Sequence, residues 1–128
     1  MISLLFWVLA AVSNAVMDTL NHHYYTSIFK SSNEKHNQWW NPDFSWKNKY
    51  TFGNKDYGRN MKWIVITDAF HFFKGLMLMF LVLSVLTFDN FYFLDFHIVT
   101  VPIITLIYVL FWWAFFELFY KYILRNKI

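Results

Sequence analysis

Cysteine is absent from this 128-residue chain, which also contains only three glycines and two prolines. The lack of cysteine excludes a disulfide framework, a thiolate metal site and a cysteine nucleophile. With so few glycines there is no glycine-rich phosphate-binding loop. Charged residues make up 15% of the chain, against about a quarter in soluble domains. Any chemistry must therefore come from a small number of oxygen and nitrogen side chains.

Apolar residues are abundant instead, at 58% of the chain, and 24% of the residues are aromatic. Three runs carry no charge, namely Ile2–Met17, Gly75–Phe88 and Ile98–Phe116. Each continues into a helical pattern, and about 20 residues are needed to cross a bilayer. We therefore expect a single all-α domain, 1–128, with three transmembrane helices. The expected helices cover about 2–25, 61–88 and 98–124, with a basic-aromatic loop at about 30–60.

The first apolar run has small residues spaced like a signal-peptide cleavage site, at Ser13-Asn14-Ala15. No basic residue precedes it, as the first part of a signal peptide requires. We therefore expect this segment to be a retained membrane anchor.

Basic residues are distributed unevenly around these runs. Lys30–Lys62 contains seven Lys or Arg against three acids, Asp89–Asp95 contains two acids and no base, and the tail is basic. Cytoplasmic loops of membrane proteins carry the excess of Lys and Arg. This pattern predicts an external N-terminus and a cytoplasmic C-terminus. Because topology explains the positive charge, no nucleic-acid partner is expected.

With that topology, five ionisable side chains fall near one membrane face. They are Asp18, His22, Asp68, His71 and Glu117. Charged groups at membrane depth are costly and need a partner or a function. The two Asp/His pairs have helical spacing, so each pair shares one face of its helix. Gly75, on the side of the second pair, is expected to allow close approach of another helix.

Such a set of oxygen and nitrogen ligands suits a divalent metal such as Zn, Mn or Fe. A metal near the headgroups can activate water, which predicts a hydrolase acting on a lipid or lipid-linked substrate. Asp68, His71 and Asp18 are the expected catalytic acid and base groups. Whether the chain is an enzyme stays open, because the same residues can form a structural polar core. Asp18 with Lys74, or Glu117 with Lys121, can be plain ion pairs.

Two further functions are compatible with the sequence. Aromatic residues on all helix faces suit a non-catalytic small subunit or regulator of a larger membrane complex, or a homo-oligomer. A proton or ion path is less favoured, because the outer halves of the predicted spans lack polar groups.

The segment His36–Tyr50 alternates aromatic residues with Lys and Asn, which is typical of the headgroup layer. It is either an interfacial anchor or a lid over the polar cluster. Lys47, Lys49 and Lys74 are then candidates for holding an anionic headgroup. Ser45 is a possible nucleophile, but sequence spacing assigns no His or Asp to it.

Three short stretches resemble short membrane proteins of unassigned function in bacteria and their phages. They are SWKNKY (Ser45–Tyr50), TDAFH (Thr67–His71) and MDTLNHH (Met17–His23). The resemblance implies a three-span protein of the bacterial inner membrane. It implies no activity, substrate or cofactor.

Overall fold

The computed structural model describes residues 1–59, 64–88 and 100–126. Three helices in these ranges are long and apolar enough to cross a membrane. They are α1 (Ile2–His23), α4 (Ala69–Leu86) and α5 (Thr100–Glu117), which continues as a π-helical segment, η7 (Leu118–Ile123). Within these ranges the protein is all-helical, and its three apolar helices identify it as a multi-pass membrane protein, as the sequence predicts.

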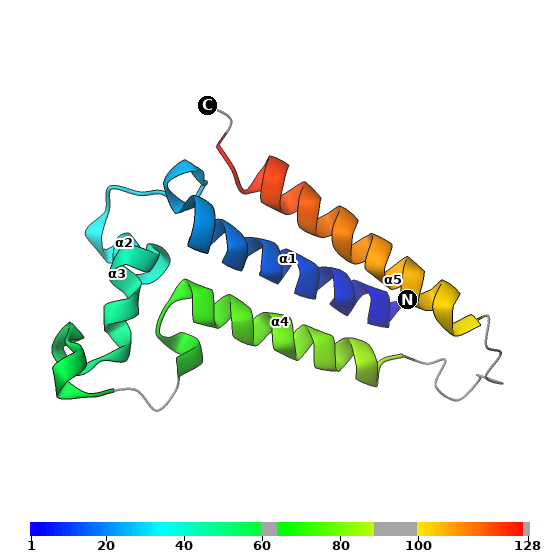
Figure 1. The fold of residues 1–128 in the computed structure, drawn as a ribbon, viewed down its shortest axis with the longest axis horizontal. Coiled ribbons are helices and arrows are strands. Elements are labelled where there is room, and N and C mark those ends of the chain that lie inside the picture. The colour runs from blue at the N-terminus through cyan, green and yellow to red at the C-terminus, as the bar shows by residue number, and fades with distance from the viewer. Residues whose placement is uncertain (60–63, 89–99, 127–128) are drawn as a thin grey trace.

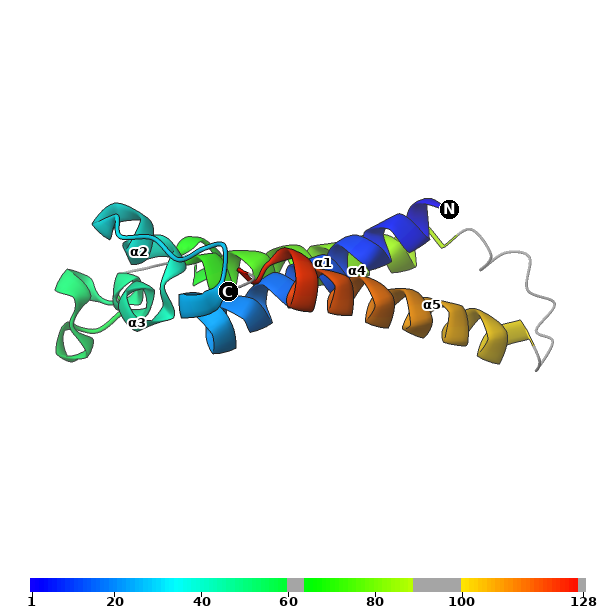
Figure 2. The ribbon, with the colours of Figure 1, turned by 90° about the horizontal axis from the view of Figure 1, so that it is seen from above.

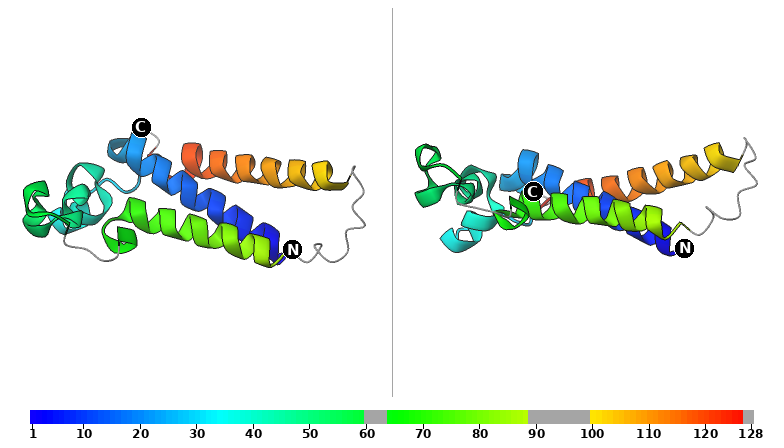
Figure 3. Two further views of the ribbon diagram at one scale, coloured as in Figure 1. Left: turned by 60° about the horizontal axis from the view of Figure 1, so that its bottom comes forward. Right: turned by 90° about the horizontal axis from the view of Figure 1, so that it is seen from below.

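Helix α1 lies between α4 and α5 (Figures 1 and 3). The start of α1, the end of α4 and the start of α5 lie at one end of the bundle. The short helices α2 (Glu34–Trp40) and α3 (Pro42–Ser45) lie at the other end, together with the end of α5. Figure 2 shows the same separation from above. We call these the N-terminal end and the loop end of the bundle.

Small residues of α1 allow its neighbours to approach closely. Ala10, Ala11 and Ala15 are fully buried, as is the larger Leu20, while much of α4 and α5 is exposed. Interfaces between transmembrane helices favour small side chains because the backbones can then come near each other. The sequence of α1 therefore fits it for the middle position.

Hydroxyl groups join the three helices at the N-terminal end. Ser3 Oγ donates to the carbonyl of Ser84 at 2.7 Å, and Ser84 Oγ donates to the carbonyl of Ser3 at 2.9 Å. Tyr108 Oη lies 2.9 Å from Ser3 Oγ, and Trp7 Nε1 donates to the carbonyl of Tyr108 at 2.8 Å. The expectation that this half of the spans lacks polar groups is wrong, because the sequence interpretation weighed only ionisable residues.

The second transmembrane helix begins at Ala69, later than the expected position near residue 61. Asp68 has an extended backbone, and its side chain accepts a hydrogen bond from the main-chain N–H of His71 at 2.9 Å. This is an N-cap, which satisfies a helix-start N–H that has no partner within the helix. Residues Ile64–Ile66 form a 3₁₀ turn, η5, and residues 60–63 lie outside the described ranges.

Gly75 does allow a close approach, but to η5 rather than to another transmembrane helix. A β-carbon at Gly75 would lie 2.6 Å from Cγ1 of Val65. The chain therefore folds back along α4 before entering it. The sequence identified the need for a small residue but not the partner, because the return of the chain at η5 has no periodic signal.

The chain after η7 is fastened to the chain after α1. Ile28 N donates to the carbonyl of Leu124 at 3.0 Å, and Asn126 N donates to the carbonyl of Thr26 at 2.9 Å. The Asn126 side chain adds a hydrogen bond to the carbonyl of Ser27 at 2.9 Å. These contacts hold the ends of α1 and η7 together at the loop end of the bundle.

The loop between α1 and α4 packs against the bundle through aromatic rings. Trp40 stacks on Phe29 with ring centroids 4.7 Å apart and lies 6.0 Å from Phe73 of α4. Trp39 lies 6.2 Å from Phe72. Aromatic pairs at these separations contribute beyond the area they bury. The loop therefore covers the first turns of α4, where the Asp68 cap lies.

Candidate functional site

Asp68 and His71 form the most tightly organised polar pair at the loop end. Asp68 is 2% exposed. The Nδ1 atom of His71 lies 2.8 Å from Asp68 Oδ1 and 2.9 Å from Oδ2. Thr67 Oγ1 donates to Asp68 Oδ2 at 3.0 Å. The carboxylate thus accepts several hydrogen bonds. These offset the cost of burying a charged group away from water.

This geometry defines which nitrogen of His71 is available. A carboxylate can only accept hydrogen bonds, so the Nδ1 atom facing both of its oxygens carries the proton. In the neutral ring, Nε2 then presents a lone pair. An imidazole oriented by a carboxylate in this way can take a proton from a hydroxyl group or a water molecule.

Lys49 brings a positive charge to the same place. Its Nζ lies 3.8 Å from Asp68 Oδ2, and its side chain is 26% exposed. Its neighbour in the loop, Asn48, ties the loop to the start of α4, because its Nδ2 donates to the carbonyls of Gln38 at 2.6 Å and Thr67 at 2.8 Å. These two hydrogen bonds of the Asn48 side chain hold the chain next to Lys49 close to the start of α4.

A cavity of about 190 Å³ opens beside the pair. Three segments contribute to it: the end of α1, the loop around α3, and the start of α4. The lining residues are Asn21, Pro42, Ser45, Trp46, Lys49, Asp68, Phe70 and His71. We call this the Asp68 pocket. Asn21 and Trp46 were not among the sequence-predicted site residues, and Ser45 was a possible nucleophile with no His or Asp assigned to it. Their meeting with Asp68 depends on how the loop folds.

The remaining members of the predicted five-residue cluster lie elsewhere. Glu117 pairs with Lys121 one turn along its own helix, as one sequence interpretation expected. His22 is exposed, and its Nε2 lies 3.1 Å from the Asn21 amide nitrogen. Asp18 is half-buried on α1 and forms no ion pair with Lys74 or with any other described residue.

These positions bear on the predicted metal site. Across residues 1–59, 64–88 and 100–126, no group of three or more His, Asp or Glu side chains is close enough to hold a metal ion. Of the five predicted ligands, the structure brings Asp68 and His71 together. Spacing within each helix was sufficient to pair them, but it does not set how one helix is rotated against another.

The three lysines predicted to hold a headgroup also separate. Lys49 lines the Asp68 pocket. Lys47 is exposed, with its Nζ 6.0 Å from the centre of the Trp46 ring. Lys74 is exposed on α4 and does not line the pocket. Lys49 is therefore the lysine placed to act on a molecule held there.

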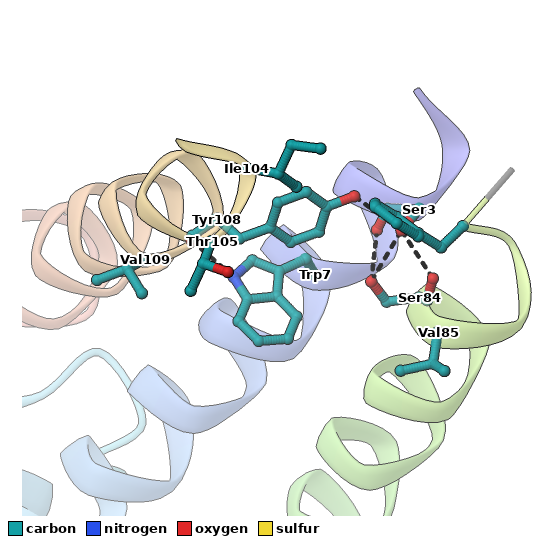
Figure 4. A pocket seen from close by; sticks show the side chains of 9 residues that line it. Ser3, Trp7, Ser84, Val85, Ile104, Thr105, Tyr108 and Val109 are labelled. Atoms are coloured by element: carbon teal, nitrogen blue, oxygen red, sulfur yellow. Dashed lines mark hydrogen bonds between the residues drawn. The ribbon is translucent and has the colours of Figure 1, made fainter. Parts of the chain in front are cut away.

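A second cavity, of about 280 Å³, lies at the N-terminal end (Figure 4). Its polar groups are the hydroxyls of Ser3, Ser84, Thr105 and Tyr108, with Trp7 beside them. The remaining lining residues are Val85, Phe88, Ile104 and Val109. This cluster was not identified from the sequence. Ser84, the single hydroxyl-bearing residue of α4, could have indicated it. No His, Asp, Glu, Lys or Arg side chain lines this cavity, so its hydroxyl groups are better suited to joining the helices than to acid–base chemistry.

Comparison with known proteins adds no assignment. No family model matches the chain, and no curated protein and no solved structure matches it. The predicted resemblance to small three-span membrane proteins of bacteria and phages therefore stays a prediction. A proposal about function must be based on the Asp68 pocket itself.

Proposed function

We propose that this protein is a membrane-bound hydrolase that cleaves an ester bond of a lipid or lipid-linked substrate in the Asp68 pocket. The observation that carries the proposal is the contact of His71 Nδ1 with both oxygens of the buried Asp68 carboxylate, beside a cavity. Asp68 orients the imidazole and stabilises its protonated form. His71 acts as general base and then as general acid.

The position of the pocket suggests the substrate class. Asp68 is the residue immediately before the apolar span Ala69–Leu86, so it lies at the level of the headgroups. Trp46 and Phe70 line the pocket with aromatic surface, and Lys49 adds a positive charge. Tryptophan and lysine both favour the interface between membrane and water. A substrate with an apolar chain, an ester group and an anionic headgroup fits these surroundings.

The distribution of basic residues favours the cytoplasmic face of the membrane for the Asp68 pocket. The loop that covers the pocket is the basic segment of the sequence, and the positive-inside rule places such a loop in the cytoplasm. We infer a site at the cytoplasmic face of a bacterial inner membrane, with the N-terminus outside. The predicted divalent metal is not needed for this mechanism. If one binds, His71 Nε2 is its available ligand, and Asp68 supports the ring from behind.

Hydrolysis by protein reconstituted in liposomes tests the proposal. Liposomes of phosphatidylglycerol and phosphatidylethanolamine, each with one radiolabelled acyl chain, report the release of labelled fatty acid. His71→Gln and Asp68→Asn should lower the rate at least about 100-fold, the usual contribution of a positioned acid or base. His22→Gln, which alters an exposed histidine at the same end, should keep the wild-type rate.

Two results would overturn the proposal. One is a wild-type protein that releases no fatty acid from either lipid at any concentration tested. The other is a His71→Gln variant with the wild-type rate, since the reaction would then not use the histidine of the pocket.

A second candidate function, as a subunit of a larger membrane complex or a homo-oligomer, is favoured by α5. None of the residues in the most apolar stretch of the span Val101–Ile123 is buried. Trp113 is 63% exposed and Leu106 is 58% exposed. Native mass spectrometry in a mild detergent tests this function. A fixed stoichiometric partner or a second copy would favour it, and a monomer would count against it.

A further inference from the structure

Ser45 shares the Asp68 pocket with the carboxylate–imidazole pair. It is the last residue of α3 and is 4% exposed. It lines the cavity that Asp68 and His71 also line. Its main-chain N–H donates to the carbonyl of Asn41 at 2.8 Å, which closes the single turn of α3. This hydrogen bond fixes the main chain of Ser45 and does not involve its hydroxyl group.

The local sequence fixes α3 firmly. Asn41 is 2% exposed and caps the helix, with its Oδ1 accepting from the N–H of Asp43 at 3.0 Å. Pro42 follows at the first helical position, where its fixed φ suits the helix. Asn48 then links the loop to the carbonyl of Thr67, directly before Asp68. Ser45 and Asp68 thus lie on two segments that are hydrogen-bonded to each other.

The hydroxyl of Ser45 differs from the hydroxyls of two other buried serines, Ser13 and Ser27. Ser13 Oγ donates to the carbonyl of Leu9 at 2.8 Å, and Ser27 Oγ donates to that of Tyr24 at 2.8 Å. Donation to the main chain is how a serine in an apolar setting usually satisfies its proton. Among the described residues, no hydrogen bond joins Ser45 Oγ to another group. The buried Thr19 Oγ1 also has no hydrogen-bond partner among them, but Ser45 lines the Asp68 pocket and Thr19 does not.

We propose that Ser45 is the nucleophile of the Asp68 pocket and forms an acyl-serine intermediate with a lipid ester. This inference rests on the proposed hydrolase function. It adds a covalent step that direct attack by water would not have. A serine hydroxyl is a weak nucleophile and needs a base, and His71, which lines the same pocket, supplies it.

The reaction balances with groups already named. As Ser45 Oγ bonds to the ester carbonyl carbon, its proton passes to His71 Nε2. The bond from that carbon to the alcohol oxygen then breaks, and His71 returns the proton to the departing alcohol. Water next attacks the acyl carbon and gives a proton to His71 Nε2. The bond from that carbon to Ser45 Oγ then breaks, and His71 returns the proton to Oγ, which releases the fatty acid and restores the hydroxyl. Lys49 offsets the negative charge on the carbonyl oxygen in both steps.

Covalent labelling tests the nucleophile directly. The full-length protein in liposomes is treated with an alkyl fluorophosphonate, which phosphonylates activated serine hydroxyls, and the adduct is located by peptide mass spectrometry. Wild type should carry a single adduct on Ser45. Ser45→Ala should carry none, and His71→Gln should label at least about 100-fold more slowly. Ser32→Ala, which alters an exposed serine of the same loop, should label like wild type.

A second variant, Ser45→Cys, tests the proposal even if Ser45→Ala does not fold, because cysteine is close to serine in size. A thiol at this position should accumulate an acyl thioester from the labelled lipid, seen as the added mass of one acyl chain and released by neutral hydroxylamine. A wild-type adduct on another residue, or no thioester in a folded Ser45→Cys protein, would overturn the inference.

The two proposals fail in different ways. If Ser45→Ala hydrolyses lipid at the wild-type rate while His71→Gln does not, the nucleophile is water, and only the inference about Ser45 is wrong. If the wild-type protein neither hydrolyses lipid nor reacts with the fluorophosphonate, both proposals are wrong.

Discussion

Ser3 and Ser84 exchange hydrogen bonds in both directions, each hydroxyl donating to the main-chain carbonyl of the other residue, at 2.7 and 2.9 Å. The two residues are 81 positions apart in sequence and join the start of α1 to the end of α4. Both are buried, at 3% and 2% exposure. In an apolar bundle, a lost partner leaves a carbonyl that water cannot easily satisfy.

Loss of the hydrogen bond that the Ser84 hydroxyl donates should loosen the N-terminal end of the bundle, although the bond from Ser3 Oγ to the main-chain carbonyl of residue 84 remains. We expect Ser84→Ala to lower the free energy of unfolding by about 0.6 kcal/mol, the average for a polar contact between transmembrane helices, and by no more than about 1.7 kcal/mol. Unfolding in mixed detergent micelles measures it. Thr105→Ala is the matched control, since Thr105 lines the same cavity but donates to the carbonyl of Val101 in its own helix. Equal losses in the two variants would contradict the prediction.

We expect that position 75 must be glycine because a larger residue would clash with the Val65 side chain. A β-carbon at Gly75 would meet Val65 Cγ1 at 2.6 Å, so one side chain has to move. We expect Gly75→Ala to destabilise the wild-type protein. In a Val65→Ala background the same change should be neutral or stabilising, because alanine favours helices by about 1 kcal/mol over glycine.

A double-mutant cycle measures this dependence. The coupling between the two positions should fall in the range of about 0.5–3 kcal/mol found for residues in contact. If Gly75→Ala has the same effect in both backgrounds, Gly75 is needed for some other reason.

The architecture was predictable because a membrane-spanning helix requires a long run of apolar residues, which is easily recognised in a sequence. The three charge-free runs predict the spans, and the structure has helices at Ile2–His23, Ala69–Leu86 and Thr100–Glu117. The start of α4 was not predictable from periodicity, since η5 is also apolar. The N-cap at Asp68 sets the start of α4. From the sequence, Asp68 was interpreted as a catalytic residue or metal ligand and was therefore not considered as a helix cap.

The candidate site was predictable in part. Asp68 and His71 are three residues apart, so a helix start alone brings them together. Asp18 and Glu117 required a definite rotation of α1 and α5, which helical spacing within one segment does not determine. Ser45 and Lys49 reach the pocket through the fold of the loop, which depends on contacts such as Asn48 with Thr67. No local pattern encodes those contacts.

Asp68 has two roles that substitution can separate. Its side chain caps α4 and also orients His71. Asparagine caps helices about as well as aspartate, whereas alanine costs about 1 kcal/mol at such a position. We therefore expect Asp68→Asn to unfold closer to the wild type than Asp68→Ala does. Both should lose lipid hydrolysis, because neither retains the carboxylate that stabilises protonated His71.

Stability and activity measured on the same samples decide between the roles. If Asp68→Asn keeps full hydrolysis while Asp68→Ala loses it, the carboxylate serves as a cap only. The orientation of His71 would then have to come from other groups.

Glu117 and Asp18 should be dispensable for hydrolysis. Glu117 pairs with Lys121, whose side chain is 54% exposed, and such exposed pairs contribute little to stability. Asp18 does not line the Asp68 pocket. We expect Glu117→Gln and Asp18→Asn to release fatty acid at the wild-type rate, and adding a chelator should not change it. If these residues held a catalytic metal, each loss would lower the rate by at least about 10-fold, because even groups that only support metal ligands have effects of that size. A matching loss in both variants, restored by added Zn²⁺ or Mn²⁺, would mean that the helices rotate to assemble the five-residue site and that His71 acts as a ligand rather than as a base.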